Sequence, residues 1–180
     1  MQEIEILKKG GIILYPTDTI WGLGSDATQP LSIKRIIGLK GRDNTKNLLI
    51  LVSDIEMLRN YVEEIPNNAL ELIQNTTSPL TIIYPKAKNL PIELLSQDES
   101  IGIRIPNHNY CQKLLREFGK PIISTSANLS SHPSPISFNE ISQKIKQEVD
   151  FIADLERDII SNQVSSIYKL ISSTEIIKIR

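Results

Sequence analysis

Residues 124–128 read Ser-Thr-Ser-Ala-Asn and follow the apolar pair Ile122 and Ile123, which is typical of a buried strand. Hydroxyl and carboxamide groups can donate hydrogen bonds to phosphate oxygens, ribose or a purine edge without adding charge. A hydroxyl-rich turn at a strand end has the same composition. This stretch alone therefore leaves two interpretations open, a nucleotide site and a plain turn.

Three cations, Lys40, Arg42 and Lys46, lie within LKGRDNTK at residues 39–46. The segment begins at the expected end of a helix, where the helix dipole alone favours positive side chains. If the three cations converge, they instead suit a triphosphate, whose charge must be neutralised before a nucleophile approaches phosphorus. The segment is thus a candidate phosphate clamp.

Arg104 interrupts an apolar run in SIGIRIP, residues 100–106. In an alternating strand it shares a face with Gly102 and Pro106, opposite the isoleucines. A guanidinium on a rigid strand can bind a carboxylate through two parallel hydrogen bonds. An exposed arginine on a solvated sheet face would show the same pattern.

The segment YPTDTIWGLGSDA, residues 15–27, places three polar side chains between Pro16 and Trp21. Gly22 and Gly24 permit either close backbone approach to a ligand or positive φ. The segment has neither the GxGxxG spacing nor the lysine of a P-loop, so neither standard phosphate motif applies. A polar turn with a packed Trp21 is the alternative.

Short runs rich in Ile, Leu and Val, bounded by Gly, Pro, Ser or Asn, predict the strands that must position these groups. The runs cover residues 12–15, 48–52, 80–84, 101–105, 122–124, 151–153, 166–171 and 176–179. Helix-period segments alternate with them, so the fold class is a layered α/β (α+β) arrangement around a mixed sheet. We expect residues 1–180 to form a single domain.

Helix boundaries follow from capping signals in the same sequence. Asp54 should cap one helix, Asn109 should cap another that Gly119 ends, and Ser137 begins a capping-box spacing that should open a helix through Ile145. Apolar stripes predict further helices over residues 31–39 and after Pro66.

Composition limits the classes of function. The 20 basic and 21 acidic side chains nearly cancel, so contact with nucleic acid would need a local basic patch. Cys111 is the only cysteine, which excludes an intrachain disulfide and favours a reducing compartment. His108 and His132 lie too far apart to predict a zinc site. With no signal-peptide pattern and no long apolar run, we expect a cytoplasmic protein without a membrane anchor.

The chain resembles the YrdC/Sua5 family in five ordered blocks, YPTDTIWGLG, KGR, SPLTIIY, SIGIRIP and PIISTSANLS. Members of that family are L-threonylcarbamoyladenylate synthases. The resemblance implies an open, twisted mixed sheet with helices around a concave cavity. It also implies L-threonine, bicarbonate or CO2, and ATP with Mg2+ as reactants, and threonylcarbamoyl-AMP and pyrophosphate as products. A separate transfer complex would then place the threonylcarbamoyl group on tRNA.

The resemblance also implies roles for residues that match the family's motifs. Lys40 and Arg42 would be catalytic through the phosphates. The amino acid would be bound by Thr19, Arg104 and Ser165. The nucleotide would be bound by Arg42, Lys46, Ser100, Ser124, Ser126, Asn128, Ser134 and Arg180. No residue is implied as a metal ligand.

The sequence departs from the family's pattern at several positions. Asp43 stands where a proline usually follows KxR, and Leu51 stands where some members place a histidine that contacts threonine. That contact should be absent or supplied elsewhere. The chain resembles the short YrdC type, without the long extension of Sua5.

Two other classes of function stay open on the sequence. One is a non-enzymatic protein of the same fold that binds double-stranded RNA or tRNA, although 5% aromatic residues offer no evident stacking platform. The other is a relative that adenylates the carbamoyl group of carbamoyl phosphate. Threonine-dependent release of pyrophosphate from ATP would separate the three.

Overall fold

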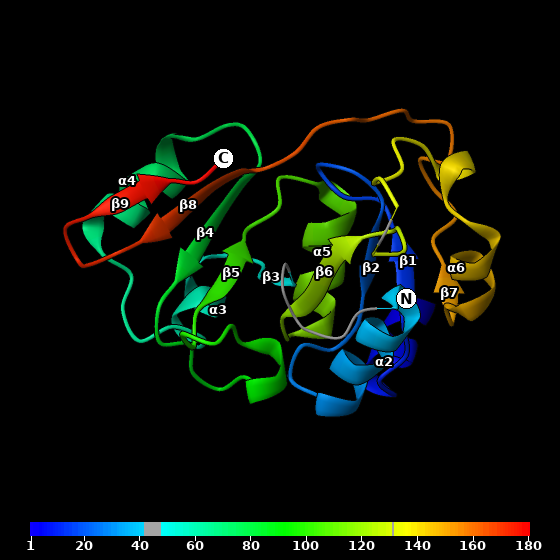
Figure 1. Cartoon of the computed structure of the whole chain (residues 1–180), viewed down its shortest axis with the longest axis horizontal. Coiled ribbons are helices and arrows are strands. Elements are labelled where there is room, and N and C mark those ends of the chain that lie inside the picture. The colour runs from blue at the N-terminus through cyan, green and yellow to red at the C-terminus, as the bar shows by residue number, and fades with distance from the viewer. Residues whose placement is uncertain (42–47, 131) are drawn as a thin grey trace.

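One nine-stranded sheet organises the computed structural model, which describes residues 1–41, 48–130 and 132–180 (Figure 1). The strand order is β7-β1-β2-β6-β3-β5-β4-β8-β9. The strands are β1 (Ile13–Tyr15), β2 (Gly22–Gly24), β3 (Leu49–Leu51), β4 (Leu80–Tyr84), β5 (Ile101–Arg104), β6 (Ile122–Ser126), β7 (Phe151–Ile152), β8 (Ser166–Leu170) and β9 (Ile176–Lys178).

The sheet is mixed, as the sequence predicted. The pairs β1–β7, β3–β5 and β4–β8 are parallel, and the other neighbours are antiparallel. All eight apolar runs form strands within one or two residues of the expected bounds. The predicted fold class is confirmed.

Helices and short 3-10 turns connect the strands. They are α1 (Gln2–Lys8), α2 (Pro30–Lys40), α3 (Ile55–Arg59), α4 (Asn67–Asn75), η1 (Ile92–Leu94), α5 (Asn109–Phe118), η2 (Phe138–Glu140) and α6 (Gln143–Glu148). Within the described ranges, none of these helices is long and apolar enough to cross a membrane.

Two of the predicted helix ends are confirmed. The Asp54 carboxylate accepts a hydrogen bond from the Met57 amide at 2.8 Å and caps α3. Gly119 ends α5 at φ 73°, a left-handed conformation that costs glycine little.

Two predicted caps are wrong. His108, rather than Asn109, caps α5, because its Nδ1 accepts from the Cys111 amide. The Ser137 capping box opens only the 3-10 turn η2, and α6 begins later, where the Ser142 hydroxyl accepts from the Ile145 amide. The apolar residue Ile141 lies between the two turns and is buried, so tertiary packing overrides the local spacing.

Strand β2 was not expected, because glycine at two of its three positions weakens the strand pattern. Neither Gly22 nor Gly24 has positive φ, so that interpretation is wrong. A Cβ on Gly24 would lie 2.6 Å from Tyr15 Cε1 and 2.9 Å from Ile122 Cγ2. Gly24 thus allows β1 and β6 to pack tightly beside it.

The core lies along β1, β3 and β6 and under α5. Cys111 on α5 is fully buried, and its thiol donates to the Pro16 carbonyl at 3.4 Å. Burial raises the pKa of this thiol far above its usual range. Cys111 is therefore a packing residue that holds α5 against the end of β1.

Strands β7 and β8 are consecutive in sequence but lie near opposite ends of the sheet. The connecting segment, residues 153–165, runs along one side of the molecule between them (Figure 1). Its Ser161 hydroxyl donates to the Thr19 carbonyl at 2.5 Å, and its Ser161 amide donates to the Ile136 carbonyl at 2.8 Å. The connection is thereby tied to the loops that follow β1 and β6.

Candidate functional site

A cavity of about 1210 Å³ lies over the middle of the sheet, lined by residues from β2, β4, β5, β6, β8 and their loops. Nine of the predicted site residues line it, and they come from distant parts of the chain. They are Thr19, Ser100, Arg104, Ser124, Ser126, Asn128, Ser134, Ser165 and Arg180. Lys40 lies next to this lining, and Arg42 and Lys46 fall outside the described residues.

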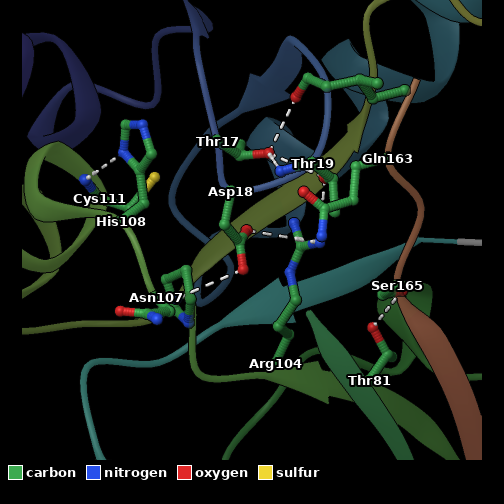
Figure 2. A network of polar contacts seen from close by, with 12 residues as sticks. Thr17, Asp18, Thr19, Thr81, Arg104, Asn107, His108, Cys111, Gln163 and Ser165 are labelled. Carbon is green, nitrogen blue, oxygen red and sulfur yellow. Dashed lines mark hydrogen bonds and ion pairs between the residues drawn. The ribbon is translucent and has the colours of Figure 1, made fainter. Parts of the chain in front are cut away.

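Arg104 is the buried cation of this cavity, only 5% exposed, so the alternative of a solvated arginine is wrong. Its Nη1 donates to Thr19 Oγ1 at 3.1 Å and lies 3.6 Å from Asp18 Oδ1 (Figure 2). Its Nε is buried and has no hydrogen-bond partner among the described residues. Because buried polar groups are almost always paired, this guanidinium is prepared to bind an anion.

Asp18 was not among the predicted site residues. Its side chain is 5% exposed, and its Oδ2 accepts from the Asn107 amide at 3.3 Å. The carboxylate therefore offsets part of the charge of Arg104 without covering its Nε. A carboxylate between two threonines in PTDT was the signal in the sequence that could have indicated it.

Thr17 and Thr19 form a short hydroxyl chain beside Arg104 (Figure 2). Their Oγ1 atoms lie 2.9 Å apart, and Thr17 Oγ1 also donates to the Ile20 carbonyl at 2.8 Å. The Thr19 amide donates to Thr17 Oγ1 at 3.1 Å. Both side chains are at most 9% exposed, and both residues line the cavity.

Ser165 lines the same cavity as Thr19. Its Oγ accepts from Thr81 Oγ1 at 2.9 Å, and both side chains are buried. Arg180 Nε and Nη2 each donate to the Ser165 carbonyl at 3.2 Å. Backbone hydrogen bonds with Ile167 hold Arg180 in place. Arg180 and Ser165 thus form one connected part of the cavity wall.

Ser100 belongs to a polar cluster at the edge of the cavity. Its hydroxyl donates to Asp98 Oδ1 at 2.5 Å, and Lys169 Nζ lies 2.8 Å from Asp98 Oδ2. The hydrogen bonds from Lys169 and Ser100 lower the pKa of Asp98 to about 2. Asp98 and Lys169 also line the cavity but were missed, because a single charge in a loop or in a strand such as β8 carries no distinctive pattern.

The end of β6 is both a turn and part of the cavity lining, which agrees with both interpretations that its sequence left open. Ser124, Ser126 and Asn128 line the cavity, yet Ser126 Oγ also donates to Asn128 Oδ1 at 2.5 Å. Lys40, 1% exposed, donates from below to Ser126 O at 2.5 Å, Asn128 O at 2.8 Å and Asn128 Oδ1 at 3.2 Å. The turn is therefore ordered around a buried ammonium group.

Trp21 is buried, as expected for a packed turn, and it also lines the cavity, as expected for a ligand-binding segment. Its ring packs on Phe138 with centroids 4.9 Å apart. Leu51, at the position of the family's histidine, is 1% exposed in β3. Among the described residues, no group of three or more His, Cys, Asp or Glu side chains is arranged to hold a metal ion.

An open mixed sheet with a polar, cation-bearing cavity defines a small-molecule binding domain of the α/β type. The sequence model of the Sua5/YciO/YrdC family, whose description is telomere recombination, matches residues 5–180 of this chain. The chain belongs to this family, and the resemblance seen in the sequence is confirmed.

Two relatives in sequence carry the name threonylcarbamoyl-AMP synthase. The threonylcarbamoyl-AMP synthase of Pseudoalteromonas translucida is 32% identical over 154 residues, covering 84% of this chain and 82% of the relative. The threonylcarbamoyl-AMP synthase of Psychromonas ingrahamii is 38% identical over 147 residues, covering 79% and 76%.

Solved structures share the fold over nearly the whole chain. P. abyssi Sua5 complexed with L-threonine matches with a TM-score of 0.86 at 26% identity, covering 99% of this chain and 52% of that one. E. coli YciO matches with a TM-score of 0.85 at 27% identity, covering 99% and 86%. This chain thus spans about half the length of the Sua5 structure and most of the YciO structure.

Proposed function

We propose that this protein is an L-threonylcarbamoyladenylate synthase, which forms threonylcarbamoyl-AMP and pyrophosphate from L-threonine, bicarbonate or CO2, and ATP. The names of its relatives support this activity. The observation that carries the proposal is the buried guanidinium of Arg104, whose Nε is unpaired within the part of the chain that the structure describes, in the same cavity as the hydroxyl-rich end of β6.

The amino acid would occupy the part of the cavity between Arg104, Thr19 and Ser165. Arg104 can bind a carboxylate through its Nε, which has no partner among the described residues, and a charge-assisted hydrogen bond in a buried site is strong. P. abyssi Sua5, whose structure was solved with L-threonine, has the same fold. This likeness supports an amino-acid site in the cavity.

The nucleotide would lie along the end of β6, against Ser124, Ser126, Asn128 and Ser134. Ser100 and Arg180 line the same cavity and would complete its nucleotide side. Their hydroxyl, carboxamide and guanidinium groups suit ribose, purine and phosphate oxygens.

The phosphates would be neutralised by Lys40, Arg42 and Lys46. The described contacts of Lys40 suggest that it also acts through the turn it anchors, because Ser126 and Asn128 both line the cavity. ATP would enter as its Mg2+ complex, with the ion carried by the substrate's own phosphates.

The reaction would join a carbamate oxygen of N-carboxy-threonine to the α-phosphorus. As that P–O bond forms, the bond from the α-phosphorus to the bridging oxygen breaks, and its electron pair leaves with pyrophosphate. No covalent enzyme intermediate is needed, so the protein would act by positioning and by charge stabilisation. Carbamates hydrolyse in water, and the cavity would limit that loss.

In the cell, the product would pass to a threonylcarbamoyl-transfer complex that modifies tRNA, and the protein would act in the cytoplasm. Direct contact with tRNA is part of the same proposal. The near balance of charges gives that contact no general electrostatic support.

The test is release of pyrophosphate from ATP in bicarbonate buffer, with L-threonine and with serine and glycine as controls. Release that depends on threonine supports the proposal. RNA binding with a steep salt dependence and no consumption of ATP would instead favour the non-enzymatic alternative. Release of pyrophosphate with carbamoyl phosphate and without threonine would favour a protein that adenylates the carbamoyl group of carbamoyl phosphate.

A further inference from the structure

Thr17 makes three hydrogen bonds through one hydroxyl group, deep beside the proposed amino-acid site. It donates to the Ile20 carbonyl at 2.8 Å and accepts a hydrogen bond from the Thr19 amide at 3.1 Å. Its third neighbour is the Thr19 hydroxyl at 2.9 Å. The Thr17 side chain is 9% exposed, so water replaces none of these contacts easily.

The single proton of each hydroxyl fixes the direction of this chain. A hydroxyl has one proton to donate and two lone pairs. The Ile20 carbonyl can only accept, so the Thr17 proton points to it. Thr17 Oγ1 can then only accept from Thr19, and it does so with both the amide and the hydroxyl of that residue.

Thr19 is left with a defined polarity. Its hydroxyl proton points to Thr17. One of its lone pairs accepts a hydrogen bond at 3.1 Å from Arg104 Nη1, which can only donate. The second lone pair of Thr19 Oγ1 has no donor among the described residues, and Thr19 lines the cavity. Thr19 can therefore meet a ligand only as a hydrogen-bond acceptor.

We infer that Thr17 is a positioning residue that holds the proton of Thr19, so that Thr19 selects a hydrogen-bond donor on the amino-acid substrate. The inference rests on the proposed function. With the carboxylate on Arg104, the nearest donors of L-threonine are its side-chain hydroxyl and its N–H group. The hydroxyl and the N–H group are both hydrogen-bond donors close to the bound carboxylate.

The opposite polarity makes a different prediction. If Thr17 donated to Thr19, the Thr19 proton would point into the cavity and would bind a carboxylate oxygen. Removing the Thr17 hydroxyl would then leave Thr19 able to donate to the substrate as before. The two arrangements thus differ in the effect of one substitution.

The experiment is calorimetric titration of L-threonine into the wild-type protein, Thr17→Val, Thr17→Ser, Thr19→Val and the double variant. Valine has the shape of threonine without its hydroxyl, and serine keeps the hydroxyl. We expect Thr17→Val to weaken binding by about two- to tenfold, the value of one hydrogen bond, and Thr17→Ser to stay close to wild type. The double variant should bind no more weakly than Thr19→Val alone, because Thr17 acts through Thr19.

L-2-Aminobutyrate, which lacks only the hydroxyl of threonine, distinguishes the two donors. If the hydroxyl is the donor, Thr17→Val removes the preference of the wild type for threonine. If the N–H group is the donor, Thr17→Val weakens both ligands by the same factor while the double variant still shows no added loss. Either result supports the inference.

Wild-type affinity in Thr17→Val, or losses that add in the double variant, would overturn the inference. Unfolding in urea checks that each variant folds, and Thr17→Ala gives a second variant without the hydroxyl if the valine does not fit. If the wild type binds no L-threonine, the proposed function and this inference both fail. If the wild type binds threonine and releases pyrophosphate but Thr17 has no effect, only the inference fails.

Discussion

Replacing Lys40 with methionine tests whether this lysine is an anchor of the turn after β6. Methionine keeps most of the length and the apolar stem but removes the ammonium group. Three oxygen acceptors within 3.2 Å then lose their donor, two on Asn128 and one on Ser126. The side chain is 1% exposed, so water compensates only in part.

The expected loss follows from that geometry. A buried acceptor left without its partner costs about 1–3 kcal/mol, and Ser126 Oγ already donates to one of the three. We expect Lys40→Met to lower the free energy of unfolding by about 3 kcal/mol. For a chain of this size that corresponds to a fall in Tm of about 6–12 °C.

Urea unfolding followed by circular dichroism measures this change, and Lys34→Met is the matched control on the same helix, α2. The Lys34 side chain is 64% exposed and lies 3.9 Å from Glu93, a pair worth less than about 1 kcal/mol. If Lys40→Met costs no more than Lys34→Met, the anchoring argument is wrong. Loss of ATP binding without loss of stability would assign Lys40 to the phosphates alone.

Three further predictions concern single positions. Arg104→Lys keeps the charge near Asp18 but loses the planar donor pair, so the KM for L-threonine should rise about tenfold or more while the KM for ATP changes little; equal losses for both substrates would contradict the assignment. Gly24→Ala should lower the free energy of unfolding by about 2 kcal/mol, because the new Cβ would make contacts that begin at 2.6 Å. Gly38→Ala, whose Cβ would meet none of the described residues within 4 Å, should stabilise helix α2 by up to about 1 kcal/mol, and thermal unfolding of both variants decides this. The pKa of Asp98 is lowered to about 2, so its carboxylate stabilises the fold at neutral pH, and this contribution disappears as the pH falls from about 4 to about 2. Because the Asp98 side chain is 53% exposed, the difference in the free energy of unfolding between wild type and Asp98→Asn should stay below about 1 kcal/mol. A pH series should show that this difference vanishes at the acid end.

The strands were predictable because apolar runs bounded by turn residues need only local information. The same holds for the cap at Asp54 and the stop at Gly119, whose physical causes lie within one turn. Strand β2 could not be predicted, because its place depends on how closely Gly24 lets Tyr15 approach across the sheet. Helix α1 was missed although Ile4 and Leu7 have helical spacing and are both buried.

The site was predictable in its residue types more than in its contacts. Arg104 stood out because a charge in an apolar strand is unusual, and the structure places it in the cavity. Asp18, which pairs with Arg104, and Thr17, which contacts Thr19, did not stand out, because a polar loop gives no sign of which side chains are buried. The role of Lys40 depends on a contact with residues 86 and 88 positions away, and no local pattern encodes it.

The connection between β7 and β8 has a consequence for how the chain reaches its native state. Strand β8 pairs with β4, and Thr81 and Ser165, which meet there, are 84 positions apart. Contacts between such distant residues slow folding, because the loop entropy is lost before the contact is gained. Ser165 and Arg180 line the cavity only when this long-range pairing has formed, so we expect substrate binding to appear after β8 has docked on β4.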